Sequence, residues 1–177
     1  MATVSWGAPT LEFIKLGSGV DPSENTAWAS GSNSYVKIRG DVLLEDSSQL
    51  NTSDGETKTL KNEFGEDVDR KQMPASYDFE TSVIKKKGET VVQTAFSPVN
   101  GIVDGDWAMR LTPEDYQTTG FAFYKCSIST AKGWNADQGA LDIIRVAGLV
   151  PDGPSKEICR DYVATSDPNA TTTQNPG

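Results

Sequence analysis

The stretch from Glu56 to Gln72 constrains the fold of this chain more than any other, because it reads as a hairpin without an apolar face. Both halves are polar on each side, and Phe64-Gly65-Glu66 supplies a turn between them. Neither face of such a ribbon can seed a core. The sequence therefore predicts either a loose loop or a sheet that another molecule completes, and we favour the second interpretation.

The pattern changes after Pro74, where a strand that can contribute to a core begins. Ser76 to Ile84 alternates cleanly, with Tyr77, Phe79 and Val83 on one face. Further strands are predicted over 3–6, 10–16, 35–44, 102–111, 120–130 and 140–146. Residues 89–96 have apolar side chains at helical spacing and predict one short helix, with a bent strand as the alternative because several are β-branched.

This order of elements predicts a mainly β fold: an antiparallel β-sandwich or barrel with one short flanking α-helix and a long extended hairpin. The length of 177 residues suits a single domain over residues 1–164. Residues 165–177 are rich in Thr, Asn and Pro, so we expect a flexible C-terminal tail.

The most apolar predicted strand runs from Gly120 to Thr130. A strict two-residue period puts Phe121 and Phe123 on one face and Cys126 and Ile128 on the other. Apolar residues on both faces predict a central strand that is covered on both sides, paired as a hairpin with 140–146. The strand over 35–44 carries Gly40 as a candidate bulge.

Two side chains admit two interpretations each. Trp28 lies in a polar loop over 17–33, and we favour packing on its own chain over contact with a partner. For Cys126 we favour a buried thiol over a disulfide with Cys159.

Composition narrows the function classes. The net charge of −9 argues against a protein that grips phosphates, and the absence of histidine removes the commonest proton shuttle and metal ligand. No nucleophile, phosphate-loop or calcium motif is present, so we predict no catalytic residues, no metal and no cofactor. Neither a secretory signal nor a membrane-spanning run is apparent, so the expected compartment is the cytosol, without a membrane partner.

Short strings along the chain resemble bacteriophage tail tube proteins, particularly major tail proteins of phages that infect Bacteroidetes. They are the polar hairpin with a glycine tip, Ser-Tyr-Asp-Phe-Glu, Gly-Asp-Trp-Ala-Met-Arg, Thr-Pro-Glu-Asp, Gly-Phe-Ala-Phe-Tyr-Lys-Cys-Ser-Ile-Ser, Asp-Gln-Gly-Ala-Leu and a closing Leu-Val-Pro. The resemblance extends over residues 35–154.

The resemblance implies a non-enzymatic structural virion protein that self-assembles into stacked, hexameric rings, forming a tube for DNA delivery. Its partners would be copies of itself, other tail proteins and DNA in transit, and it would be assembled in the host cytoplasm and located in the virion tail. Asp78 and Glu80 would be lumen or interface carboxylates. The hairpin residues implied to lie between subunits are Glu56, Lys58, Lys61, Glu63, Phe64, Glu66, Asp67, Asp69 and Arg70.

Two other classes remain open on the sequence. A secreted or displayed β-sandwich binding module, for example one that binds carbohydrate, would need an exposed aromatic platform. A hydrolase would use paired carboxylates such as Asp104 and Asp106, which are also common on acidic surfaces.

Overall fold

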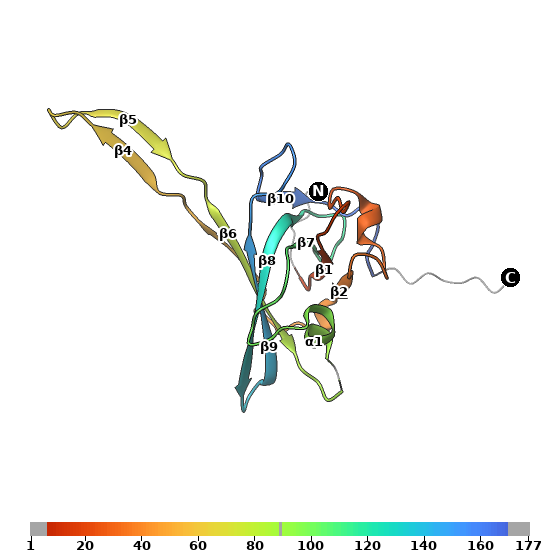
Figure 1. Ribbon diagram of the computed structural model, residues 1–177. Coiled ribbons are helices and arrows are strands. Elements are labelled where there is room, and N and C mark those ends of the chain that lie inside the picture. The colour runs from red at the N-terminus through yellow and green to blue at the C-terminus, as the bar shows by residue number, and fades with distance from the viewer. Residues whose placement is uncertain (1–6, 89, 170–177) are drawn as a thin grey trace.

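A computed structural model of the chain describes residues 7–88 and 90–169. The fold is mainly β, as predicted, and its principal sheet has the strand order β2-β1-β7-β8-β9-β6-β3, with β10 paired to β8 (Figure 1). All pairs are antiparallel. The strands of this sheet are β1 (Thr10–Lys15), β2 (Val36–Ile38), β3 (Gln49–Ser53), β6 (Ser76–Ile84), β7 (Trp107–Thr112), β8 (Gly120–Asn135), β9 (Gly139–Gly148) and β10 (Cys159–Tyr162).

Strand β8 belongs to both halves of this sheet, which gives the body its sandwich-like form. Its first half pairs with β7 and β10, and its second half pairs with β9. The two halves face each other across one core, since the Phe79 ring of β6 lies 5.5 Å from the Phe121 ring of β8. Within the described residues β2 and β3 do not pair with each other, so the sheet is not closed into a barrel.

A register shift in β8 corrects the faces predicted for this strand. Trp107 opposes Cys126, whereas Met109 opposes Phe123, so β8 carries one extra residue between these pairs. The bulge reverses the alternation, and Phe121, Phe123, Cys126 and Ile128 all contribute to the same core. The faces predicted from a strict two-residue period were therefore wrong, because β8 contains an inserted residue that the sequence period does not reveal.

The single α-helix of the described residues, α1 (Val91–Phe96), covers this core, as the helical interpretation predicted. Its Phe96 ring lies 5.1 Å from the ring of Phe13 and 5.1 Å from that of Trp107, both nearly perpendicular. Edge-to-face rings of this kind stabilise the packing beyond the area they bury. Through Phe96 the helix thereby packs on β1 and β7 at the same time.

A second, smaller core lies on the other face of β1 and β7. It consists of Ile14, Ala27, Trp28 and Ala108, and a short 3-10 helix, η1 (Asn25–Trp28), brings Trp28 to it. Trp28 is buried and its indole nitrogen donates to the Pro22 carbonyl over 2.9 Å. Packing of this tryptophan on its own chain is confirmed.

Several predicted boundaries were wrong. The strand expected over 35–44 ends at Ile38, where the chain turns into a 3-10 helix, η2 (Gly40–Val42). The polar connection before the hairpin contains β3, and the expected strand over 102–111 begins only at Trp107. Strand β8 continues beyond its predicted end at Thr130 to Asn135. Pairing with β6 extends β3, and pairing with β9 extends β8, so in these two cases a partner strand overrode local composition.

Both ends of the chain extend beyond the described residues. The strand predicted over 3–6 lies outside the described residues, as does most of the tail over 165–177. The described part of this tail contacts the body: Lys37 Nζ donates to the Pro168 carbonyl over 2.7 Å, and Asn169 Nδ2 donates to Thr10 Oγ1 over 2.7 Å.

Candidate assembly surface

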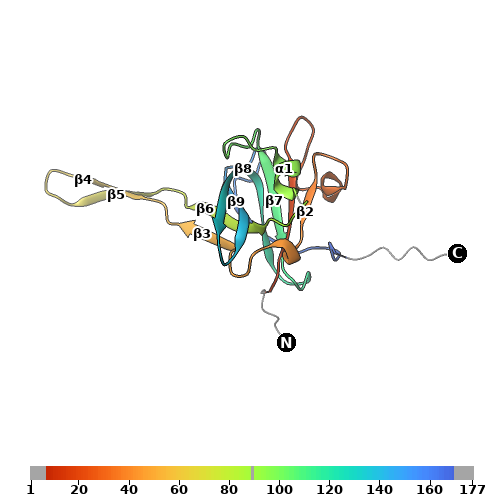
Figure 2. The ribbon, with the colours of Figure 1, turned by 90° about the horizontal axis from the view of Figure 1, so that it is seen from below.

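Strands β4 (Thr57–Lys61) and β5 (Asp67–Gln72) form a two-stranded sheet that projects from the body (Figures 1 and 2). We call residues 56–72 the arm. In the described residues β4 and β5 pair only with each other, and every arm residue is exposed. The predicted hairpin is therefore confirmed, and it does not fold back onto its own body.

Polar contacts across the strands hold the arm in register. Thr57 Oγ1 donates to Gln72 Oε1 over 2.7 Å, and Lys61 Nζ lies 3.5 Å from Asp67 Oδ1. At the turn, Asn62 Oδ1 accepts hydrogen bonds from two backbone amides, those of Phe64 and Glu66. These contacts are solvated and individually weak, so they set the shape of the arm more than its stability.

Three apolar side chains on the arm have no core to enter. Leu60 is 64% exposed, Phe64 at the turn 89% and Val68 62%. Single exposed apolar residues are ordinary on protein surfaces, but these three are carried by one ribbon with no buried face.

The joint between arm and body is tightly built. A Cβ on Gly55 would lie 1.7 Å from the Met73 carbonyl oxygen, so only glycine fits where the segments entering and leaving the arm lie against each other. The Met73 amide donates to the Glu56 carbonyl over 2.9 Å, and Gln72 Nε2 donates to the Gly55 carbonyl over 2.9 Å. Below the joint, β3 and β6 continue the ladder, so the arm is an extension of the body sheet.

The structure brings the two predicted carboxylates together on the body, not on the arm. Asp78 and Glu80 lie on the face of β6 opposite the buried Phe79. With Ser127, Ser129 and Arg145 they line a shallow depression of about 320 Å³. Arg145 Nε lies 3.7 Å from Glu80 Oε1, so this face is less acidic than the two carboxylates suggest.

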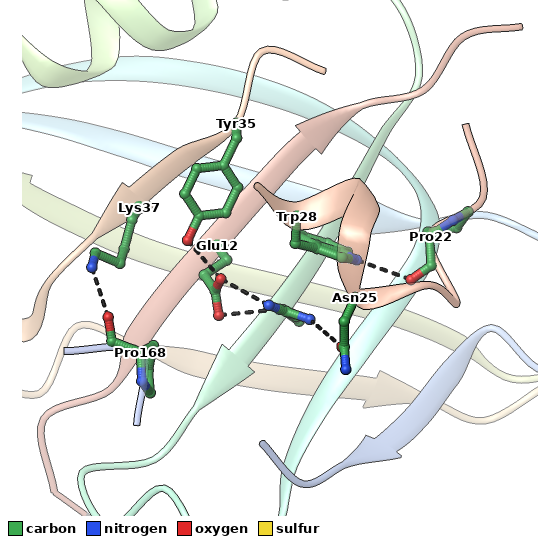
Figure 3. A network of polar contacts seen from close by, with 8 residues as sticks. Glu12, Pro22, Asn25, Trp28, Tyr35, Lys37 and Pro168 are labelled. Carbon is green, nitrogen blue, oxygen red and sulfur yellow. Dashed lines mark hydrogen bonds and ion pairs between the residues drawn. The ribbon is translucent and has the colours of Figure 1, made fainter. Parts of the chain in front are cut away.

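A buried ion pair between β1 and β7 was missed by the sequence analysis (Figure 3). Arg110 donates through Nε and Nη2 to the two carboxylate oxygens of Glu12, over 3.1 and 3.0 Å. Tyr35 Oη donates to Glu12 Oε2 over 2.6 Å. In the sequence, the ion pair is indicated only by one charged residue in each of the two strands, Glu12 and Arg110. Strand alternation alone does not show whether such a residue is buried or solvated.

The same pair affects the neighbouring aromatic side chains. The Arg110 guanidinium lies 4.6 Å from the centre of the Trp28 ring, a cation–π contact. Burial and the hydrogen bond to Glu12 raise the pKa of the Tyr35 hydroxyl, so it stays a donor across the physiological range. Burial likewise raises the pKa of Tyr162.

Both cysteines are free thiols, which confirms the preference for a buried thiol at Cys126. Burial raises the pKa of Cys126, and burial with the nearby carboxylates of Asp161 and Glu157 raises the pKa of Cys159 to about 11. Neither is an activated nucleophile.

Among the described residues no cluster of three or more His, Cys, Asp or Glu side chains is arranged to hold a metal ion. In the same residues no helix is long and apolar enough to cross a membrane. No protein-family model matches the chain, and no curated protein matches it significantly. Support for the candidate surface therefore comes from the geometry of the arm.

Proposed function

We propose that this chain is a structural subunit that assembles with copies of itself through the arm, forming a tube of the kind found in phage tails. The observation that carries the proposal is a projecting ribbon whose two faces and outer edges meet no other part of the chain that the structure describes. An isolated two-stranded hairpin is only marginally stable in water, and exposed strand edges invite pairing. Contact with neighbouring subunits supplies the missing burial.

The electrostatics suit a conduit for DNA. The net charge of −9 repels phosphates, and Asp78 on the open sheet face adds to this repulsion, whereas Arg145 offsets the charge of Glu80. DNA can therefore slide without the contacts that would hold it. In this proposal hexameric rings stack into a tube within the virion tail, assembled in the host cytoplasm with other tail proteins. The subunit needs no catalytic centre and no cofactor.

The alternative of a carbohydrate-binding module has less support. Such a site needs neighbouring exposed rings, whereas Phe64 and Trp134, the two most exposed aromatic side chains within residues 7–88 and 90–169, lie on different hairpins.

The test is deletion of the arm. Residues 57–72 are replaced by Asn-Gly, which closes a two-residue hairpin, and both proteins are imaged by negative-stain electron microscopy at high concentration. The wild type is expected to form rings or filaments, and the variant to remain monomeric with an unchanged melting temperature. Filaments from the armless chain, or monomers from the wild type under all conditions, would contradict the proposal.

A further inference from the structure

An open groove lies between the edge strand β2 and helix α1. It has a volume of about 620 Å³ and is lined mainly by apolar surface. Its lining residues come from two elements, namely Ser34, Tyr35 and Val36 on one side and Thr90, Val91, Thr94 and Ala95 on the other. Within the described residues β2 pairs only with β1, so its outer edge borders the groove unpaired.

The walls of the groove are preorganised by the body. Tyr35 is held by its 2.6 Å hydrogen bond to Glu12, whose own orientation is fixed by Arg110 (Figure 3). On the other side, Val91 and Ala95 pack against the main core. A rigid apolar groove binds with less loss of conformational entropy than a surface that must first order itself.

Charge complementarity supports an acidic occupant. The basic run Lys85-Lys86-Lys87 precedes the groove residue Thr90 by three to five positions in the chain, and Lys86 and Lys87 are exposed. The turn of the arm is acidic, with Glu63 and Glu66 on either side of the exposed Phe64. Because the whole chain carries −9, copies repel one another in general, and attraction requires a complementary pair of patches such as these.

We propose that the groove between β2 and α1 receives Phe64 and the acidic turn of the arm from a second copy of this chain. The arm extends away from its own groove, so the occupant comes from another subunit (Figure 1). The inference rests on the proposed function, to which it adds the receiving site. An aromatic anchor in an apolar pocket with polar residues around it is a common anatomy of an interface hot spot.

The experiment is disulfide trapping between two differently tagged chains. One chain carries Glu63→Cys, which keeps the anchor Phe64, and the other carries Thr94→Cys, an exposed groove residue. The heterodimer is quantified by non-reducing electrophoresis. Control mixtures pair Thr94→Cys with Trp134→Cys or Val163→Cys, which introduce exposed thiols elsewhere. Because docking raises the local thiol concentration, the Glu63→Cys mixture is expected to exceed the controls by about tenfold or more.

Each outcome bears on one of the two proposals. Equal trapping in all mixtures, or preferred trapping by a control position, overturns the groove assignment. If filaments still depend on the arm in that case, the proposed function survives without it. Absence of both trapping and filaments overturns both.

A charge exchange gives a second measurement that needs no cysteine. Glu63→Lys with Glu66→Lys, or Lys86→Glu with Lys87→Glu, is expected to weaken assembly, and mixing the two variants is expected to restore it. Failure of the mixture to assemble better than either variant alone contradicts the proposed charge pairing.

Discussion

Strands β5 and β6 follow each other in the chain and both form antiparallel ladders, yet their side chains differ completely in burial. On β6, Phe79, Thr81 and Val83 are at most 3% exposed, whereas every residue of β5 is exposed. Strand β5 satisfies backbone groups across one neighbour, β4, whereas β6 pairs with both β3 and β9, and only β6 removes side chains from water. The comparison teaches that the stability of the body and the shape of the arm have different physical origins.

The arm depends on its joint and on cross-strand contacts, while the body depends on its main core and on the smaller core around Trp28. Substitutions should therefore separate into two groups, those that lower the stability of the body and those that affect only the arm and assembly.

The largest effect is expected in the core. Phe123→Ala removes a ring with no exposed surface and should lower the free energy of unfolding by about 3–5 kcal/mol. Chemical denaturation followed by tryptophan fluorescence measures this loss. The matched arm variant Phe64→Ala should change it by less than about 0.5 kcal/mol. Equal losses for the two would remove the distinction between body and arm.

The buried ion pair comes next. Glu12→Gln leaves Arg110 without its charge partner and should cost about 1.5–3 kcal/mol, the range for hydrogen bonds to charged groups. Replacing both residues by apolar ones, Glu12→Leu with Arg110→Met, should recover part of this loss. A double variant less stable than the sum of the two single variants would contradict this account.

The joint should show a local effect. Gly55→Ala places a methyl group against the Met73 carbonyl and should cost about 1–3 kcal/mol, confined to the arm. Hydrogen exchange is expected to accelerate for amides of residues 57–72 and to stay unchanged in β9. Gly17→Ala is the control, since a Cβ there meets open space and the backbone is not left-handed. Faster exchange throughout the body would contradict a local joint.

The smallest effect concerns two like charges on the arm. Lys58 lies directly opposite Lys71, so Lys58→Glu converts repulsion into attraction and should stabilise the arm by about 0.2–1 kcal/mol. Slower hydrogen exchange in β4 at low salt, lost at high salt, is the expected signature. Unchanged exchange at low salt would show that the two side chains do not interact.

Much of this architecture was readable in the chain. Periodicity and composition, which are local properties, predicted the arm, the alternation of β6 and the helix α1. They also predicted the burial of Trp28 and Cys126. The β3 strand was not readable, because its polar sequence is extended only through pairing with β6. The assembly role of Asp78 and Glu80 remains a prediction.

Two features belong to contacts between distant residues. The bulge in β8 gathers Phe121, Phe123, Cys126 and Ile128 on one face, and the pairing of β1 with β7 places Arg110 on Glu12 across 98 positions of the chain. Side-chain period follows from neighbours in sequence, so the exposed hairpin was foreseeable. Register and burial follow from which strands meet, and the core, the ion pair and the groove beside α1 came from the folded molecule alone.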